Sequence, residues 1–137
     1  MTDMALLNRE VYEQNPQSHP LANDGVAHVG IEDDVTPEAI EKYERVLRFE
    51  LGTFICDGQY QTGLETLIRN YVDRLRGEKQ PAPVWLSGFY GAGKSHLAKM
   101  MVALWENYTF ADGATAESVV VNLPQSVRDL LRELRAE

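Results

Sequence analysis

Four residues near the middle of the chain have the types and the spacing that phosphate binding requires. Gly88 is followed by four residues and then by Gly93, Lys94 and Ser95. This is the pattern of the P-loop, in which backbone N–H groups surround the phosphates of a nucleotide. Glycines let the backbone bend tightly enough for those N–H groups to turn inward. The pattern therefore predicts a site for a nucleoside triphosphate.

The residues of this segment have separate expected roles. Lys94 is predicted to reach the β- and γ-phosphates as the catalytic lysine, and the Ser95 hydroxyl to bind Mg²⁺. A helix that begins near Gly93 should point its positive end at the same phosphates. The predicted cofactors are ATP and magnesium. The full candidate nucleotide site consists of Gly88, Phe89, Tyr90, Gly91, Ala92, Gly93, Lys94, Ser95 and His96.

The neighbouring residues predict a strand before the pattern and a helix after it. Val84, Trp85 and Leu86 form a short apolar run. Beyond the pattern, apolar residues recur at the spacing of one helix face, at Leu97, Met100, Met101 and Leu104. We therefore predict an α/β fold of the P-loop NTPase (AAA-like) type with three layers. A buried strand at about 84–87 would carry helices at about 60–76 and 95–106 on the sheet.

Local signals support the helix at 60–76 and predict two further helices. Thr36 can cap a helix whose first position suits Pro37. The cleanest amphipathic repeat covers 60–76, and Gly77 is expected to close it. Pro124 opens a last helix with a periodic apolar stripe.

The stretches between these helices give weaker signals. Gly52 is expected to end the first helix, and residues 53–56 are β-like. Residues 118–123 fit either a strand or the end of a short helix. Cys56, the single cysteine, is expected to be a small buried hydrophobe rather than a nucleophile.

These signals divide the chain into three parts. Residues 1–33 are interpreted as an N-terminal arm or flap with little core of its own. Residues 34–80 form a helical lead-in segment. Residues 81–137 form the first part of a P-loop NTPase core, truncated before the acidic motif that binds Mg²⁺ and positions water.

The charge and composition of the chain indicate which partners it can bind and in which cellular compartment it is expected. The formal net charge is −8, and residues 1–65 carry 13 acidic and 4 basic side chains. An acidic surface repels nucleic acid, which argues against direct DNA contact by this segment. A lone cysteine, no secretory signal and no apolar run of about 18 residues indicate a cytoplasmic protein that does not enter the membrane.

The acid that hydrolysis requires has no obvious position. P-loop ATPases hold Mg²⁺ and the attacking water with an acidic residue at the end of a second strand. Here the later apolar run leads into Asn122, a neutral amide, and Asp129 and Glu133 fall on a predicted helix. No arginine finger can be assigned either. The isolated chain is thus predicted to bind nucleotide without efficient hydrolysis.

Several segments resemble the N-terminal part of the large BrxC/PglY-type P-loop ATPases of bacterial BREX phage-defence systems. The resemblance covers most of the chain and is most specific in the P-loop. It runs through Leu21–Ala27, Leu47–Leu51, Asp57–Tyr60, Trp85–Leu97, Asp112–Thr115 and Leu123–Pro124, with Asp129–Leu131 after them. Family members are much longer, so this chain would be an N-terminal fragment. The resemblance implies an AAA-like ATPase in a multi-protein complex with other defence-system proteins, with a homo-oligomer as an option at full length.

The resemblance carries over only the nucleotide and Mg²⁺ contacts Gly88, Gly91, Gly93, Lys94 and Ser95. Two other functions stay open. One is a non-hydrolysing interaction module that senses nucleotide, with an acidic N-terminal half that docks a partner. The other is a small P-loop kinase, although no arginine-rich lid follows the P-loop helix.

Overall fold

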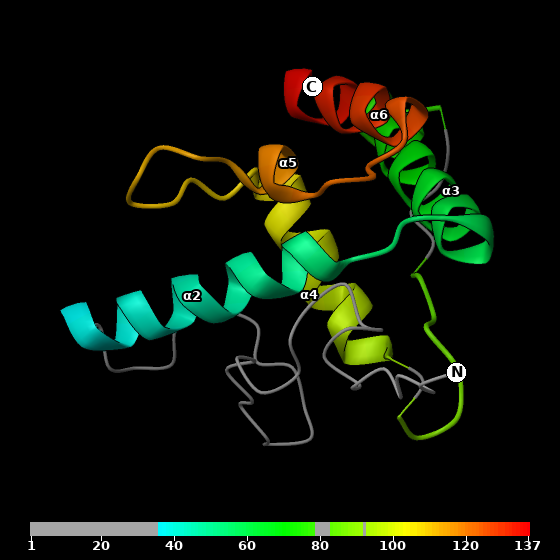
Figure 1. Ribbon diagram of the computed structural model, residues 1–137. Coiled ribbons are helices and arrows are strands. Elements are labelled where there is room, and N and C mark those ends of the chain that lie inside the picture. The colour runs from blue at the N-terminus through cyan, green and yellow to red at the C-terminus, as the bar shows by residue number, and fades with distance from the viewer. Residues whose placement is uncertain (1–35, 79–82, 92) are drawn as a thin grey trace, which may run out of the picture.

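The computed structural model describes residues 36–78, 83–91 and 93–137, which fold into a helical assembly. In chain order the described helices are α2 (Pro37–Thr53), α3 (Gly58–Leu75), α4 (Lys94–Glu106), α5 (Ala116–Val119) and α6 (Gln125–Ala136). Figure 1 shows α4 near the centre, α2 crossing it, and α3 and α6 side by side. The predicted arm at 1–33 lies outside the described residues.

The predicted three-layer α/β fold is wrong, because the described residues contain no β-sheet. Their β pairing is limited to an isolated bridge between Thr109 and Thr115. Residues 83–89, which include the predicted strand, form neither a helix nor a strand, and Trp85 is 88% exposed. A strand needs a neighbour to satisfy its backbone N–H and C=O groups. An apolar run predicts extended backbone but does not supply that neighbour.

The two other stretches with strand-like sequences, 53–56 and 118–123, do not form strands in the structure either. Gly52 does not end the first helix, since α2 continues through Thr53, and residues 54–57 form a connection without regular structure. In the stretch 118–123 the structure has the end of a short helix, α5, followed by a turn. Without these strands, the segment 83–89 has no sheet to join.

The helices predicted from local signals are confirmed. Ala39 N–H donates to the Thr36 hydroxyl at 3.3 Å at the start of α2, and Pro37 occupies the first turn. Just past the end of α3, the Glu78 N–H donates to the Asp73 carbonyl at 2.8 Å, with Gly77 between them. Capping residues and apolar periodicity were sufficient to predict these helices, because each of these signals acts within a single helix.

One apolar core joins the inner faces of the helices. Its fully buried side chains include Leu47 and Leu51 from α2, Ile68 from α3, and Met100 and Leu131 from α4 and α6. Within the described residues, no helix is both long and apolar enough to cross a membrane.

A buried carboxylate ties α5 to α6. Glu117 is 9% exposed, and its Oε2 accepts a hydrogen bond from Arg135 Nη2 at 2.7 Å. Arg128 Nη1 donates to the Glu117 carbonyl at 2.9 Å, and Arg135 Nη1 donates to the Leu104 carbonyl at 3.1 Å. These bonds fasten the short helix and the end of α4 to α6, so we assign this cluster a structural role.

Cys56 is buried, as predicted, and this makes its reactivity testable. Burial raises the pKa of the thiol above 9.0, and the carboxylates of Glu65 and Asp57 raise it further. The thiolate is the reactive form. We expect iodoacetamide at pH 8 to alkylate the folded chain far more slowly than the chain unfolded in urea, measured by mass spectrometry. Equal rates in both states would contradict the buried position.

Candidate functional site

Two glycines give the candidate phosphate loop its bend. Gly91 has a φ of 79° and Gly93 a φ of 75°, both in the left-handed region that residues with side chains rarely adopt. Gly93 is also the N-cap residue of α4. The chain therefore turns sharply from the extended residues 83–89 into the helix, as the spacing of the motif predicts.

The first turn of α4 presents backbone donors that have no partner inside the helix. The helix begins at Lys94, and its first backbone hydrogen bond runs from the Leu97 N–H to the Gly93 carbonyl at 2.8 Å. The N–H groups of Lys94, Ser95 and His96 cannot find a partner inside the helix. Together with the positive end of the helix dipole, these N–H groups form an environment that favours an anion.

The Lys94 side chain folds back across the loop. Its Nζ atom donates to the Gly88 carbonyl at 2.9 Å and to the Phe89 carbonyl at 2.8 Å. An ammonium group has three N–H donors, so one donor remains for a ligand. Lys94 thus links the beginning of the loop to the helix and holds a positive charge against the loop backbone.

The other members of the predicted site are distributed around the loop. Ser95 is exposed, which leaves its hydroxyl accessible. Phe89 and Tyr90 are 90% and 96% exposed, so they do not pack into the core. Ala92 lies outside the described residues.

The His96 side chain packs against α2. Its ring meets the Phe54 ring edge to face, with 6.2 Å between the centroids. Burial lowers the pKa of His96 from its ordinary value, the nearby Glu50 carboxylate opposes the shift, and Lys99 lowers the pKa further. Because the ring is held against the end of α2, the backbone N–H is the contribution of His96 to the loop.

A buried ion pair behind the loop was not predicted. Lys99 is 4% exposed, and its Nζ lies 2.5 Å from Glu50 Oε2. That oxygen is buried and has no partner in hydrogen-bond geometry among the described residues, so the contact is ionic rather than a directed hydrogen bond. The ammonium also lies 5.5 Å from the centroid of the Tyr43 ring. Lys99 lies off the apolar stripe of α4, and the pair anchors this side of the helix to α2.

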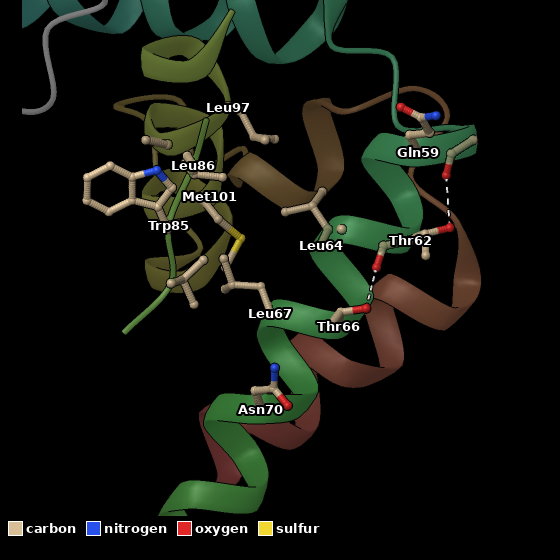
Figure 2. A pocket seen from close by; sticks show the side chains of 14 residues that line it. Gln59, Thr62, Leu64, Thr66, Leu67, Asn70, Trp85, Leu86, Leu97 and Met101 are labelled. Atoms are coloured by element: carbon tan, nitrogen blue, oxygen red, sulfur yellow. Dashed lines mark hydrogen bonds between the residues drawn. The ribbon is translucent and has the colours of Figure 1, made fainter. Parts of the chain in front are cut away.

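An apolar cavity of about 670 Å³ lies between α3 and α4 and is bordered by the extended segment. Figure 2 shows Leu64 and Leu67 of α3 facing Met101 of α4, with Leu86 of the extended segment nearby. The Trp85 indole points away from α3 in this view. Gly58 and Gln59, at the start of α3, line the same cavity, as does Leu97 in the first turn of α4.

The later acidic residues are engaged on the surface of α6. Asp129 accepts a hydrogen bond from Gln125 at 2.8 Å and from Arg132 at 3.2 Å. Glu133 pairs with Arg76 of the α3 C-cap at 2.6 Å. Asn122 is exposed in a turn. None of these three is recorded in contact with the loop residues of the described chain.

The part of the chain that the structure describes shows no cluster of metal ligands. Within the described ranges, no group of three or more His, Cys, Asp or Glu side chains is placed to hold a metal ion. A P-loop magnesium ion does not need such a group, because phosphate oxygens and water supply most of its ligands.

No protein-family model matches the chain, and no solved structure matches it.

Proposed function

We propose that the chain binds Mg·ATP at the loop from Gly88 to Ser95 and serves as the nucleotide-binding part of a P-loop ATPase. The observation that carries the proposal is the position of Lys94. Its ammonium group bridges the Gly88 and Phe89 carbonyls at the beginning of the loop, while its backbone begins α4. The loop thus carries one positive side chain and leads into a helix whose first N–H groups have no partner inside the helix.

The residues present fit both components of the ligand. Phosphate oxygens would accept from the N–H groups of Gly93, Lys94 and Ser95 and from the third donor of the Lys94 ammonium. The Ser95 hydroxyl would bind Mg²⁺, which prefers oxygen ligands and keeps several waters. The ion would supply charge neutralisation to the β- and γ-phosphates.

The resemblance to BREX ATPases places this binding function in a larger setting. In this proposal the chain is the N-terminal part of a phage-defence ATPase that works in the cytoplasm with other defence-system proteins. Direct DNA contact is not expected from this segment, because its net charge is −8.

A second candidate is a module that senses nucleotide without hydrolysing it. The positions of Asp129 and Glu133 favour this candidate, since both carboxylates are paired on the surface of α6. Without an acid that positions water and an arginine that stabilises the transferred charge, binding would not lead to rapid turnover. Both candidates share the same Mg·ATP site.

Isothermal titration of the 137-residue chain with ATP, with and without Mg²⁺, tests the binding proposal. We expect Ser95→Ala to weaken binding about tenfold with Mg²⁺ and to change it little without Mg²⁺, because only the metal contact is lost. Ser87→Ala, an exposed serine just before the loop, is the matched control and should bind as the wild type does.

A phosphate-release assay on the same samples separates the two candidates. We expect the purified chain to hydrolyse ATP scarcely above background. Robust release that Lys94→Ala abolishes would instead show that a catalytic acid is present in this chain. An absence of saturable ATP binding would contradict the proposed function itself.

A further inference from the structure

A tyrosine from α3 reaches the phosphate loop. Tyr60 lies in the first turn of α3, far from the loop in sequence. A β-carbon built on Gly93 would lie 3.9 Å from the Tyr60 hydroxyl oxygen. A side chain at position 93 would therefore touch the Tyr60 hydroxyl, and the glycine leaves that space open. The start of α3 thus lies next to the end of the loop at Gly93.

The Tyr60 hydroxyl is available to a ligand. The residue is 47% exposed, and within the described part of the chain its hydroxyl has no hydrogen-bond partner. A phenolic O–H can both donate and accept. Its neighbour Gly93 has no side chain, so nothing at that position fills the space between the hydroxyl and the loop.

We propose that Tyr60 is a further nucleotide contact, whose hydroxyl donates a hydrogen bond to a phosphate oxygen. This inference rests on the proposed Mg·ATP site. The loop donors of Gly93 and Lys94 would draw the phosphates to the place that the hydroxyl adjoins. A hydrogen bond to an ionised oxygen is stronger than one between neutral groups, so the phosphates are the acceptors that this donor favours.

The contact gives α3 a specific part in binding. The other proposed phosphate contacts, Lys94, Ser95 and the backbone donors, all belong to the loop or to α4. Their contacts with phosphate do not depend on the position of α3. Tyr60 comes from a different helix. Nucleotide binding would therefore fasten the start of α3 to the start of α4.

Titration of Tyr60→Phe with Mg·ATP and with Mg·tripolyphosphate tests this contact, because the substitution removes only one oxygen atom. We expect both ligands to bind about tenfold more weakly than they bind to the wild type. Tyr71→Phe is the matched control, further along the same helix, where the ring packs against Trp105 with 4.8 Å between centroids. The control should bind both ligands with wild-type affinity.

The other outcomes each have a definite meaning. Unchanged affinity of Tyr60→Phe for both ligands overturns the contact while the proposed function stands. A loss confined to ATP also overturns it, because the hydroxyl would then meet the ribose or base. If the wild type binds neither ligand, the proposed function fails and the contact fails with it.

Discussion

Lys94→Ala is expected to weaken Mg·ATP binding by about tenfold to more than a hundredfold. The substitution removes the one side-chain ammonium that meets the loop, at 2.9 Å from the Gly88 carbonyl and 2.8 Å from the Phe89 carbonyl in the described structure. A charge-assisted contact of this kind contributes about 1.5–3 kcal/mol. That range corresponds to the stated loss of affinity. Isothermal titration of the wild type and the variant measures it.

The matched control is Lys42→Ala on the exposed face of α2. It removes one positive charge without touching the loop, so it should bind Mg·ATP as the wild type does. The melting temperature of Lys94→Ala should also stay near the wild-type value, because the Gly88 and Phe89 carbonyls are solvent accessible and can bond to water. Wild-type affinity in Lys94→Ala would exclude the proposed role of this lysine.

Glu50→Gln is expected to lower the free energy of unfolding by about 3–5 kcal/mol. The variant keeps the shape of the side chain but leaves the Lys99 ammonium, which is 4% exposed, without its counter-charge. Removing one partner of a buried ion pair is costly because an uncompensated charge stays out of water. Urea unfolding followed by circular dichroism measures the change.

The double variant Glu50→Gln with Lys99→Met separates this cause from a simple loss of packing. It removes both charges, and replacing a buried pair with apolar groups is often close to neutral. We therefore expect the double variant to recover most of the lost stability. A double variant that is less stable than Glu50→Gln alone would show that the ion pair is not the source of the effect.

Helices were predictable from the sequence because their signals are local. The Thr36 cap, the apolar repeat of α3 and the closing position of Gly77 each act within a few residues. The boundaries were less certain, since Gly52 lies inside α2 rather than at its end. Tertiary burial of Leu51, next to that glycine, outweighs the weak helix preference of a single glycine.

The sheet was predicted wrongly because a strand is a non-local structure. Val84, Trp85 and Leu86 have the composition of a strand, but their local sequence does not specify which segment should pair with them. In the described structure they lie extended beside α4 and remain exposed. The spacing of the glycines, Lys94 and Ser95 in the loop does not depend on whether residues 84–86 pair with another strand.

The candidate site was predictable only in part. The motif identified the bend at Gly91 and Gly93 and the helix that starts at Lys94. The contacts of Tyr60 and the Lys99–Glu50 pair depend on how α3 and α2 pack against α4, which residue spacing does not encode. The only sign of the buried ion pair in the sequence was Lys99, which lies off the apolar stripe of α4. A lysine at such a position is equally consistent with an exposed, solvated side chain.

The most direct test of the central claim is an NMR titration of the ¹⁵N-labelled chain with Mg·ATP. We predict saturable shifts of the backbone amides of Gly91, Gly93, Lys94 and Ser95, because these N–H groups belong to the proposed phosphate loop. Mg·tripolyphosphate should move the same amides. Saturable shifts elsewhere, with these four amides unmoved, would contradict the proposed site.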